Sequence, residues 1–192
     1  MKALLLVDLQ QDFFQGPMGV KSACRILPII NQLLPLFPLI VASKDWHPKN
    51  HISFASSSYP SEHLQKWPEH CLQDSTGAEF PPELHQQYIQ KIFYKGNILT
   101  QESFSAFYQG DAGQSTGLDE YLHHHQVKDL YIAGLLAEYC VKASAEDGLK
   151  KGYRVWLIED AIASSDPSIK NCCLQQLAKQ GAKILQSKNL NI

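Results

Sequence analysis

The feature of this chain that most constrains its fold is a set of four short apolar runs, each followed by a polar residue or a glycine. The runs cover Ala3–Val7, Leu39–Ala42, Leu130–Ala133 and Val155–Ile158. A short run that is apolar throughout is typical of a strand in a parallel sheet, because such a strand is buried on both faces. The four runs therefore predict buried parallel strands.

Stretches with helical spacing separate or follow these runs, at Ser22–Leu36, Leu118–His125, Cys140–Lys151 and Pro167–Gln180. Asp166 and Pro167 form a start signal for the last helix, and Gly152 and Gly181 stand where helices stop. Pro28 gives the first helix an alternative start, because a proline inside a helix costs about 3 kcal/mol.

Strands that alternate with helices predict an α/β fold, with a doubly wound, mainly parallel sheet and helices on both faces. Ligands of such sheets bind beyond the carboxyl ends of the strands. We expect residues 1–192 to form one domain, since this length is within the usual range. From about Asp45 to Asn97 the sequence shows little periodicity and is rich in proline, histidine, serine and aromatic residues. We interpret this stretch as an irregular insertion over the strand ends, where long loops are usually functional.

The charge of the chain excludes several classes of partner. Seventeen lysines and arginines stand against nineteen aspartates and glutamates, which gives a net charge of −2, and no block of like charges occurs. Neither a nucleic acid nor a membrane surface is expected as a partner, so the ligand should be a small molecule.

The N-terminus and the cysteines predict a location in the cytoplasm. Only five apolar residues separate Lys2 from Asp8, fewer than the roughly 7–15 of a signal-peptide core, and no run approaches the ~18 residues of a membrane span. The five cysteines are odd in number and irregularly spaced, which argues against a secreted disulfide framework. We expect a soluble cytoplasmic protein with free thiols, and a homo-oligomer is compatible with these features.

Two polar residues follow apolar runs at the predicted sheet edge. Asp8 comes directly after the first run, so its carboxylate is either a base screened from water or a simple loop cap. Cys140 stands where the pattern changes from strand to helix. At a helix N-terminus the dipole and the free N–H groups favour a thiolate and can hold an oxyanion. The alternative is a small buried thiol without a chemical role, which is how we interpret Cys24, Cys172 and Cys173.

Asp45 and His47 indicate a metal site, because their two-residue spacing puts both side chains on one face of an extended segment. A third ligand is needed, and His51, His63 and His70 are all candidates. One carboxylate with two imidazoles suits zinc, iron or manganese and leaves positions for water or a ligand. The alternative is a histidine-rich loop that is only solvated.

Lys95 and the run His123–His125 carry weaker signals. Lys95 ends a short apolar stretch and is either drawn to a carboxylate at the sheet edge or an ordinary surface lysine. The histidine run lies at a predicted helix end, and we interpret it as a polar face.

Six motifs, in order along most of the chain, resemble the nicotinamidase branch of the isochorismatase-like cysteine hydrolases. They are Val-Asp-Leu-Gln-Gln-Asp-Phe at 7–13, Lys-Asp-Trp-His-Pro with Asn-His-Ile-Ser-Phe at 44–54, Trp-Pro-Glu-His-Cys at 67–71, Gly-Ala-Glu-Phe at 77–80, Tyr-Lys-Gly at 94–96 and Glu-Tyr-Cys-Val at 138–141. The resemblance implies a six-stranded, mainly parallel sheet. It also implies hydrolysis of nicotinamide to nicotinate and ammonia through a thioester, in a protein that contains a metal ion.

The resemblance implies a role for each matching residue. The catalytic triad would consist of Asp8, Lys95 and Cys140, with the backbone N–H groups of Leu136 and Cys140 as the oxyanion hole. The metal ligands would be Asp45, His47 and His70, with His51 a further ligand in some relatives. Phe13 and Trp67 match residues that wall the aromatic pocket. One divalent ion is implied, with zinc expected and iron or manganese as alternatives.

One position departs from the family pattern. Where relatives usually have Ala-Thr ahead of the acidic residue, this chain has Leu136-Ala137, beside the Leu135–Leu136 peptide bond that the family typically holds cis. A backbone donor survives this change. We expect the Leu136 side chain to pack into the core rather than narrow the pocket.

Three other hypotheses stay open. The Leu136 departure permits a related small-amide hydrolase, or a ligand- or metal-binding module that keeps the fold without turnover. Asp45 with two histidines could also form the carboxylate–bis-imidazole face of an iron oxygenase, an enzyme class that needs no thiol.

Overall fold

The computed structural model describes residues 1–60, 65–110 and 113–190. Its centre is a six-stranded sheet in the order β3-β2-β1-β4-β5-β6, in which all neighbouring strands are parallel. The strands are β1 (Lys2–Val7), β2 (Ile40–Asp45), β3 (Lys91–Lys95), β4 (Asp129–Gly134), β5 (Arg154–Ile162) and β6 (Lys183–Leu185). The four strands predicted from apolar runs and the six-stranded parallel sheet are confirmed.

The two strands without a continuous apolar run lie at the edges of the sheet. In β3 only Phe93 and Lys95 are buried, and β6 has three residues, none of them buried. An edge strand pairs on one side only and is less covered by helices, so it needs no continuous apolar run. Periodicity therefore predicts the four inner strands, and the family resemblance supplies the other two.

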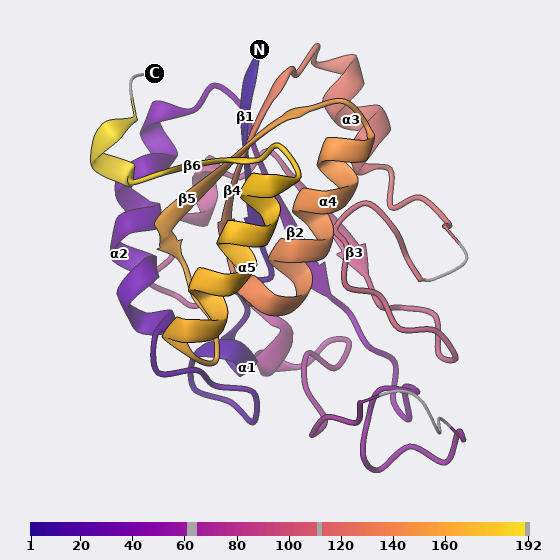
Figure 1. Ribbon diagram of the computed structural model, residues 1–192. Coiled ribbons are helices and arrows are strands. Elements are labelled where there is room, and N and C mark those ends of the chain that lie inside the picture. Colours follow the sequence, from indigo (N-terminus) through magenta and orange to yellow (C-terminus); the bar gives the residue numbers. More distant parts are fainter. Residues whose placement is uncertain (61–64, 111–112, 191–192) are drawn as a thin grey trace.

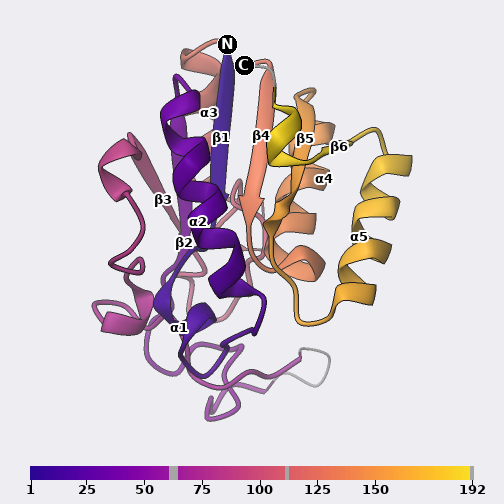
Figure 2. The same ribbon diagram turned by 90° about the vertical axis from the view of Figure 1, so that its left-hand side faces the viewer.

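Alternate side chains of the strands pack against helices on opposite faces of the sheet. Leu4 and Leu6 of β1 belong to one apolar cluster, together with side chains of α2 (Ala23–Leu33). Ala3 and Leu5 belong to a second cluster, to which α3 (Leu118–His124), α4 (Lys142–Lys150) and α5 (Pro167–Lys179) contribute. Figures 1 and 2 show these layers, and they confirm the doubly wound arrangement.

Within the described residues, no helix has both the length and the apolar character needed to cross a membrane.

Helix α2 begins at Ala23 and continues through Pro28, so the alternative start at Pro28 is wrong. The apolar face of the helix explains why the proline is tolerated. Ile26, Ile30 and Leu33 are buried against the sheet. Each such side chain contributes roughly 1.5–3 kcal/mol, which together exceeds the ~3 kcal/mol cost of the proline.

The loops at the carboxyl ends of the strands gather on one side of the molecule, below the sheet in Figure 1. They include the short helix α1 (Gln11–Phe14) and the segment between β2 and β3. The described part of that segment is irregular apart from single 3-10 turns at Thr76–Ala78 and Gln86–Tyr88. The insertion predicted for residues 45–97 therefore ends too late, because residues 91–95 form β3 of the sheet.

Candidate active site

Four polar side chains meet beyond the carboxyl ends of the neighbouring strands β3, β2, β1 and β4. Asp8 follows β1, Asp45 ends β2, and Lys95 ends β3 directly opposite Asp45 in the strand register. Cys140 lies in a π-helical turn, Ala137–Val141, between β4 and α4. Parallel strands end at the same edge of a sheet, and this brings together residues that are far apart in the sequence.

Lys95 joins the other three groups. Its Nζ lies 3.0 Å from Asp8 Oδ2 and 3.4 Å from Cys140 Sγ, and it donates hydrogen bonds to Asp45 Oδ1 and to the Ser103 carbonyl. The side chain is completely buried. A buried ammonium is tolerated only where opposite charges neutralise it, as the two carboxylates do here. The alternative of a surface lysine is wrong.

The Asp8 side chain faces this lysine instead of capping a loop. The residue is completely buried and has a φ of +50°. Its second oxygen, Oδ1, accepts a hydrogen bond of 2.6 Å from Ser43 Oγ. Burial raises the pKa of Asp8, although the Lys95 ammonium opposes this. Asp8 therefore accepts a proton more readily than an exposed carboxylate does.

Cys140 is a thiol in this environment. Burial raises the pKa of its thiol well above the usual value, and Lys95 opposes this only in part. Burial alone would lower the pKa of Lys95, but Asp45 and Asp8 outweigh it, so the lysine stays charged. This environment therefore favours the thiol over the thiolate expected from the helix N-terminus, because desolvation raises the pKa of Cys140 more than the Lys95 ammonium lowers it.

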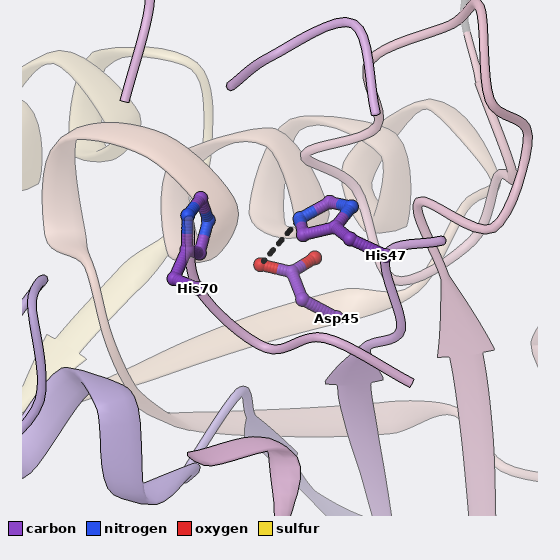
Figure 3. A group of neighbouring side chains, drawn as sticks. All are labelled: Asp45, His47 and His70. Atoms are coloured by element: carbon purple, nitrogen blue, oxygen red, sulfur yellow. Dashed lines mark ion pairs between the residues drawn. The ribbon is translucent and has the colours of Figure 1, made fainter. Parts of the chain in front are cut away.

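Asp45, His47 and His70 form a group in which each residue offers a ligand atom within 4.8 Å of the others. Figure 3 shows the two rings and the carboxylate facing one another. Nδ1 of His47 lies 2.9 Å from the Gly96 carbonyl, and Nδ1 of His70 lies 2.8 Å from the Pro68 carbonyl. A carbonyl only accepts hydrogen bonds, so each Nδ1 carries a proton and donates it, and Nε2 is the ring nitrogen left to face a metal.

The protonation state of His47 also suits a metal ligand. Burial lowers its pKa to about 3, so the ring is neutral at physiological pH. Gly96 provides the space for the ring, since a Cβ at this position, where φ is +65°, would lie 2.5 Å from His47 Cε1. The donor set of one carboxylate and two imidazoles therefore fits a divalent metal ion.

A second group with compatible spacing consists of Asp8, Asp45 and Cys140. The Lys95 ammonium already contacts all three residues. This ammonium would repel a metal cation at this group. In the group with the two histidines Lys95 contacts Asp45 alone, so that group suits a metal better.

His51 and His63 were the other candidates for the third metal ligand. His51 is completely buried, with Nδ1 2.7 Å from Ser53 Oγ and Nε2 3.0 Å from the Gln101 carbonyl. Both ring nitrogens are thus engaged, and the ring packs beside that of His47 with centroids 4.2 Å apart. His63 lies outside the described residues.

A pocket of about 390 Å³, including open solvent at its mouth, adjoins Cys140 and the three metal-ligand candidates. Its aromatic lining consists of Phe13, Trp67, Phe104 and Tyr139. The ring of Tyr139 lies edge-on to Trp67, with centroids 5.1 Å apart, and 5.6 Å from that of Phe104. Apolar walls with few polar groups suit a flat aromatic ligand. Phe13 and Trp67 were predicted here. Tyr139 belongs to the Glu-Tyr-Cys-Val motif at 138–141 but was given no role, and no motif or periodicity indicated Phe104.

The Leu136 side chain lines this pocket and also packs against the apolar cluster on the α2 face. The expectation that it packs into the core is therefore right, but the expectation that it stays clear of the pocket is wrong. The Leu135–Leu136 peptide bond is cis, as the resemblance implies. The Leu136 N–H donates no hydrogen bond to any described residue and so is free to bind an anion.

Glu102 also lines the pocket and is a functional candidate that the sequence did not indicate. Only 7% of its surface is exposed, and burial raises its pKa to about 7. Its Oε1 accepts a hydrogen bond from the Ser103 N–H at 2.8 Å. The residue lies in a loop without periodicity, so only the fold shows that it is buried.

Similar proteins agree with this geometry. The family model of the isochorismatase domain matches residues 2–189. The nicotinamidase of Escherichia coli is 39% identical over 173 residues, which cover 83% of this chain and 81% of the relative. A solved nicotinamidase/pyrazinamidase of Acinetobacter baumanii is 34% identical with a TM-score of 0.91, covering 98% of this chain and 97% of that one. The pyrazinamidase of Pyrococcus horikoshii, solved in complex with zinc, is 36% identical with a TM-score of 0.83 and covers 96% and 98%.

These matches define the class of the protein: the chain belongs to the isochorismatase family, whose α/β fold its sheet shares. Within that family, the relatives described above are nicotinamidases and pyrazinamidases, and each is matched over more than four fifths of its length.

Proposed function

We propose that this protein is a cysteine amidase that hydrolyses nicotinamide to nicotinate and ammonia. The observation that carries the proposal is the contact of Lys95 with both Asp8 and Cys140 beside an aromatic pocket. The similarity to nicotinamidases over most of the chain supports the same substrate.

In the first step Asp8 takes the proton of the Cys140 thiol, and the sulfur attacks the carboxamide carbon. The transfer moves one negative charge from the carboxylate to the sulfur, so the buried site gains no net charge. Lys95 lies 3.0 Å from Asp8 Oδ2 and 3.4 Å from Cys140 Sγ. Its ammonium therefore stabilises the negative charge on either group.

The attack forms a tetrahedral intermediate. Its negative oxygen accepts hydrogen bonds from the backbone N–H groups of Leu136 and Cys140. Asp8 then gives its proton to the amide nitrogen, the C–N bond breaks, and ammonia leaves a thioester on Cys140. A water that loses its proton to Asp8 attacks the thioester carbon. The C–S bond breaks, nicotinate is released, and the sulfur regains the proton.

Asp45, His47 and His70 would hold one divalent metal ion, with zinc expected and iron or manganese as alternatives. When bound, the ion supplies Lewis acidity toward the pyridine nitrogen and so orients the ring. Burial alone would raise the pKa of Asp45, but Lys95 outweighs it and lowers the pKa. Asp45 thus remains an anionic ligand. Phe13 and Trp67 hold the ring in the pocket.

All five cysteines are free, which fits our proposal of a cytoplasmic location.

Ammonia release from a panel of small carboxamides by the purified, metal-loaded protein tests this function. Turnover of nicotinamide is the expected result. Turnover of another amide without nicotinamide would favour a related amidase, and tight binding without turnover would favour a binding module. A reaction that consumes dioxygen would support the oxygenase hypothesis instead.

A further inference from the structure

Two polar side chains of the segment that follows β1, Gln10 and Asp12, have no role in the proposed reaction. Gln10 is completely buried and forms two hydrogen bonds with the backbone of Asp45. Its Nε2 donates to the Asp45 carbonyl at 2.7 Å, and the Asp45 N–H donates to its Oε1 at 2.8 Å. Nε2 also donates to the Ala78 carbonyl at 3.1 Å. The side chain thus holds the last residue of β2 as a neighbouring strand would.

Asp12 makes a corresponding contact with the segment that carries His70. Its Oδ2 accepts a hydrogen bond of 2.7 Å from the N–H of Cys71, the residue directly after His70. Cys71 has a φ of +47°, and its carbonyl accepts a 2.9 Å hydrogen bond from the His47 N–H. One carboxylate thus supports the backbone that connects two metal-ligand candidates. Gly77 makes room for it, since a Cβ there would lie 2.2 Å from Asp12 Oδ2.

We propose that Gln10 and Asp12 are positioning residues of the metal site, which hold Asp45 and the His70–Cys71 segment through backbone hydrogen bonds. Gln10 and Asp12 lie shortly after Asp8 in the segment that follows β1, so one short segment places the proposed base and supports the proposed metal ligands. This inference rests on the proposed metal site. Groups that orient metal ligands typically change metal affinity by roughly 10–100-fold when they are removed.

The test compares variants that remove these hydrogen bonds with variants that keep them. Gln10→Met keeps much of the side-chain volume but loses the amide, and Asp12→Ala loses the acceptor for the Cys71 N–H. Asp12→Asn retains a carbonyl oxygen that can accept the same hydrogen bond. Gln11→Ala is the matched control, because the Gln11 side chain forms no hydrogen bond with any described residue.

Zinc serves as the probe, and its transfer to a chromogenic chelator measures affinity. Gln10→Met and Asp12→Ala should lose zinc affinity by about 10–100-fold, while Asp12→Asn and Gln11→Ala stay near the native value. Melting of the metal-free and zinc-loaded forms supplies a second readout, because weaker binding shrinks the stabilisation that zinc gives. If Gln10→Met does not fold, the two Asp12 variants decide the question.

Unchanged zinc affinity, with equal losses of stability in both forms, would overturn the proposal and leave these residues a purely structural role. Absence of zinc binding by the native protein would instead contradict the metal site itself.

Discussion

Burial of Asp8, Lys95 and Cys140 makes their charges depend on one another. The lysine carries a positive charge that Asp8 and Asp45 balance, and the environment favours the neutral thiol, from which Asp8 takes the proton in the proposed mechanism. Removing one partner of a buried ion pair costs about 3–5 kcal/mol, because it leaves the other charge unpaired. Substitution of the neutral thiol does not create this problem, so Cys140 is the cleanest position for testing the chemistry.

Cys140→Ala and Cys140→Ser should abolish ammonia release and leave the fold intact. A serine hydroxyl is far less acidic than a thiol, so Asp8 cannot generate the nucleophile from it. Ammonia assays with circular dichroism and thermal melting check both parts of this prediction. Native rates in the serine variant would contradict the covalent mechanism.

Leu136→Ala should widen the pocket by roughly three carbons and admit ring-substituted nicotinamides that the native protein rejects. A few methylenes in an apolar pocket change selectivity by about 1–3 kcal/mol. The variant should also lose about 2 kcal/mol of stability, the low end for a buried leucine, because one side of the residue faces the pocket. A panel of substituted substrates, measured beside urea unfolding, separates the two effects. A loss of stability with unchanged selectivity would mean that the side chain belongs to the core alone.

Glu102→Gln should flatten the pH dependence of the unfolding free energy. The folded pKa of about 7 exceeds the usual 4.5, so the folded state binds the proton more tightly than the unfolded state. The contribution of Glu102 to the unfolding free energy is therefore greatest below about pH 4.5, and up to about 3 kcal/mol of it is lost as the pH rises through 7. The variant cannot lose this contribution. His47, whose folded pKa is lowered to about 3, destabilises the fold below about pH 6.5, but equally in both proteins.

Urea unfolding of the metal-free protein and the Glu102→Gln variant at pH 5 and pH 8 measures this difference. Equal changes of stability with pH in the two proteins would show that Glu102 does not bind the proton.

The contact between β1 and β4 places the turn that carries Cys140, the proposed nucleophile. Gly134, the last residue of β4, pairs with Val7 and has a φ of +126°. Its carbonyl accepts a hydrogen bond of 2.9 Å from the Ala163 N–H, and the next residue, Leu135, donates to the Val7 carbonyl at 3.1 Å. The backbones approach so closely that the turn has little freedom to shift.

Gly134→Ala should therefore destabilise the protein by roughly 3 kcal/mol or more, since a Cβ would lie 2.2 Å from the Val7 carbonyl oxygen. Gly152→Ala is the matched control. Its φ is +88°, but a Cβ there meets no atom within 4 Å, so the loss should be about 1 kcal/mol. Urea unfolding measures both variants. Equal losses would mean that backbone conformation, and not the close approach, makes Gly134 necessary.

Across the whole molecule, loops from distant parts of the chain converge on one edge of a rigid sheet. The topology causes this, because β1 lies between β2 and β4, so the first and last halves of the chain meet beside it. The proposed metal ligands come from the end of β2 and from the irregular segment after it. A bound ion would link these parts only in the folded state, and its removal should therefore lower stability.

Chelation should lower the melting temperature by roughly 5–10 °C, and added zinc should restore it. Zinc at about a hundred times its dissociation constant stabilises by about 2.7 kcal/mol, and 1 kcal/mol shifts the melting of a domain of this size by roughly 2–4 °C. His70→Ala should show no zinc-dependent shift, and its Michaelis constant should rise more for nicotinamide than for benzamide, which lacks the ring nitrogen. The exposed His124→Ala is the control.

If zinc raised the melting temperature of His70→Ala as much as that of the native protein, His70 would not be the third ligand. Equal losses for both substrates would mean that the ion does not hold the ring.

The sequence by itself determined those features that depend on residues close together in the chain. Apolar runs predicted the four inner strands, helical spacing predicted the main helices, and the Asp45–His47 pair indicated a metal site. Tertiary contacts decided the rest: the edge strands, the passage of α2 through Pro28, the burial of Lys95 and Glu102, the thiol form of Cys140 and the pocket position of Leu136. The physical reason is that periodicity reflects neighbours along one segment. Desolvation and charge pairing, in contrast, depend on groups that distant segments bring together, as β3 does when it places Lys95 between Asp8 and Asp45.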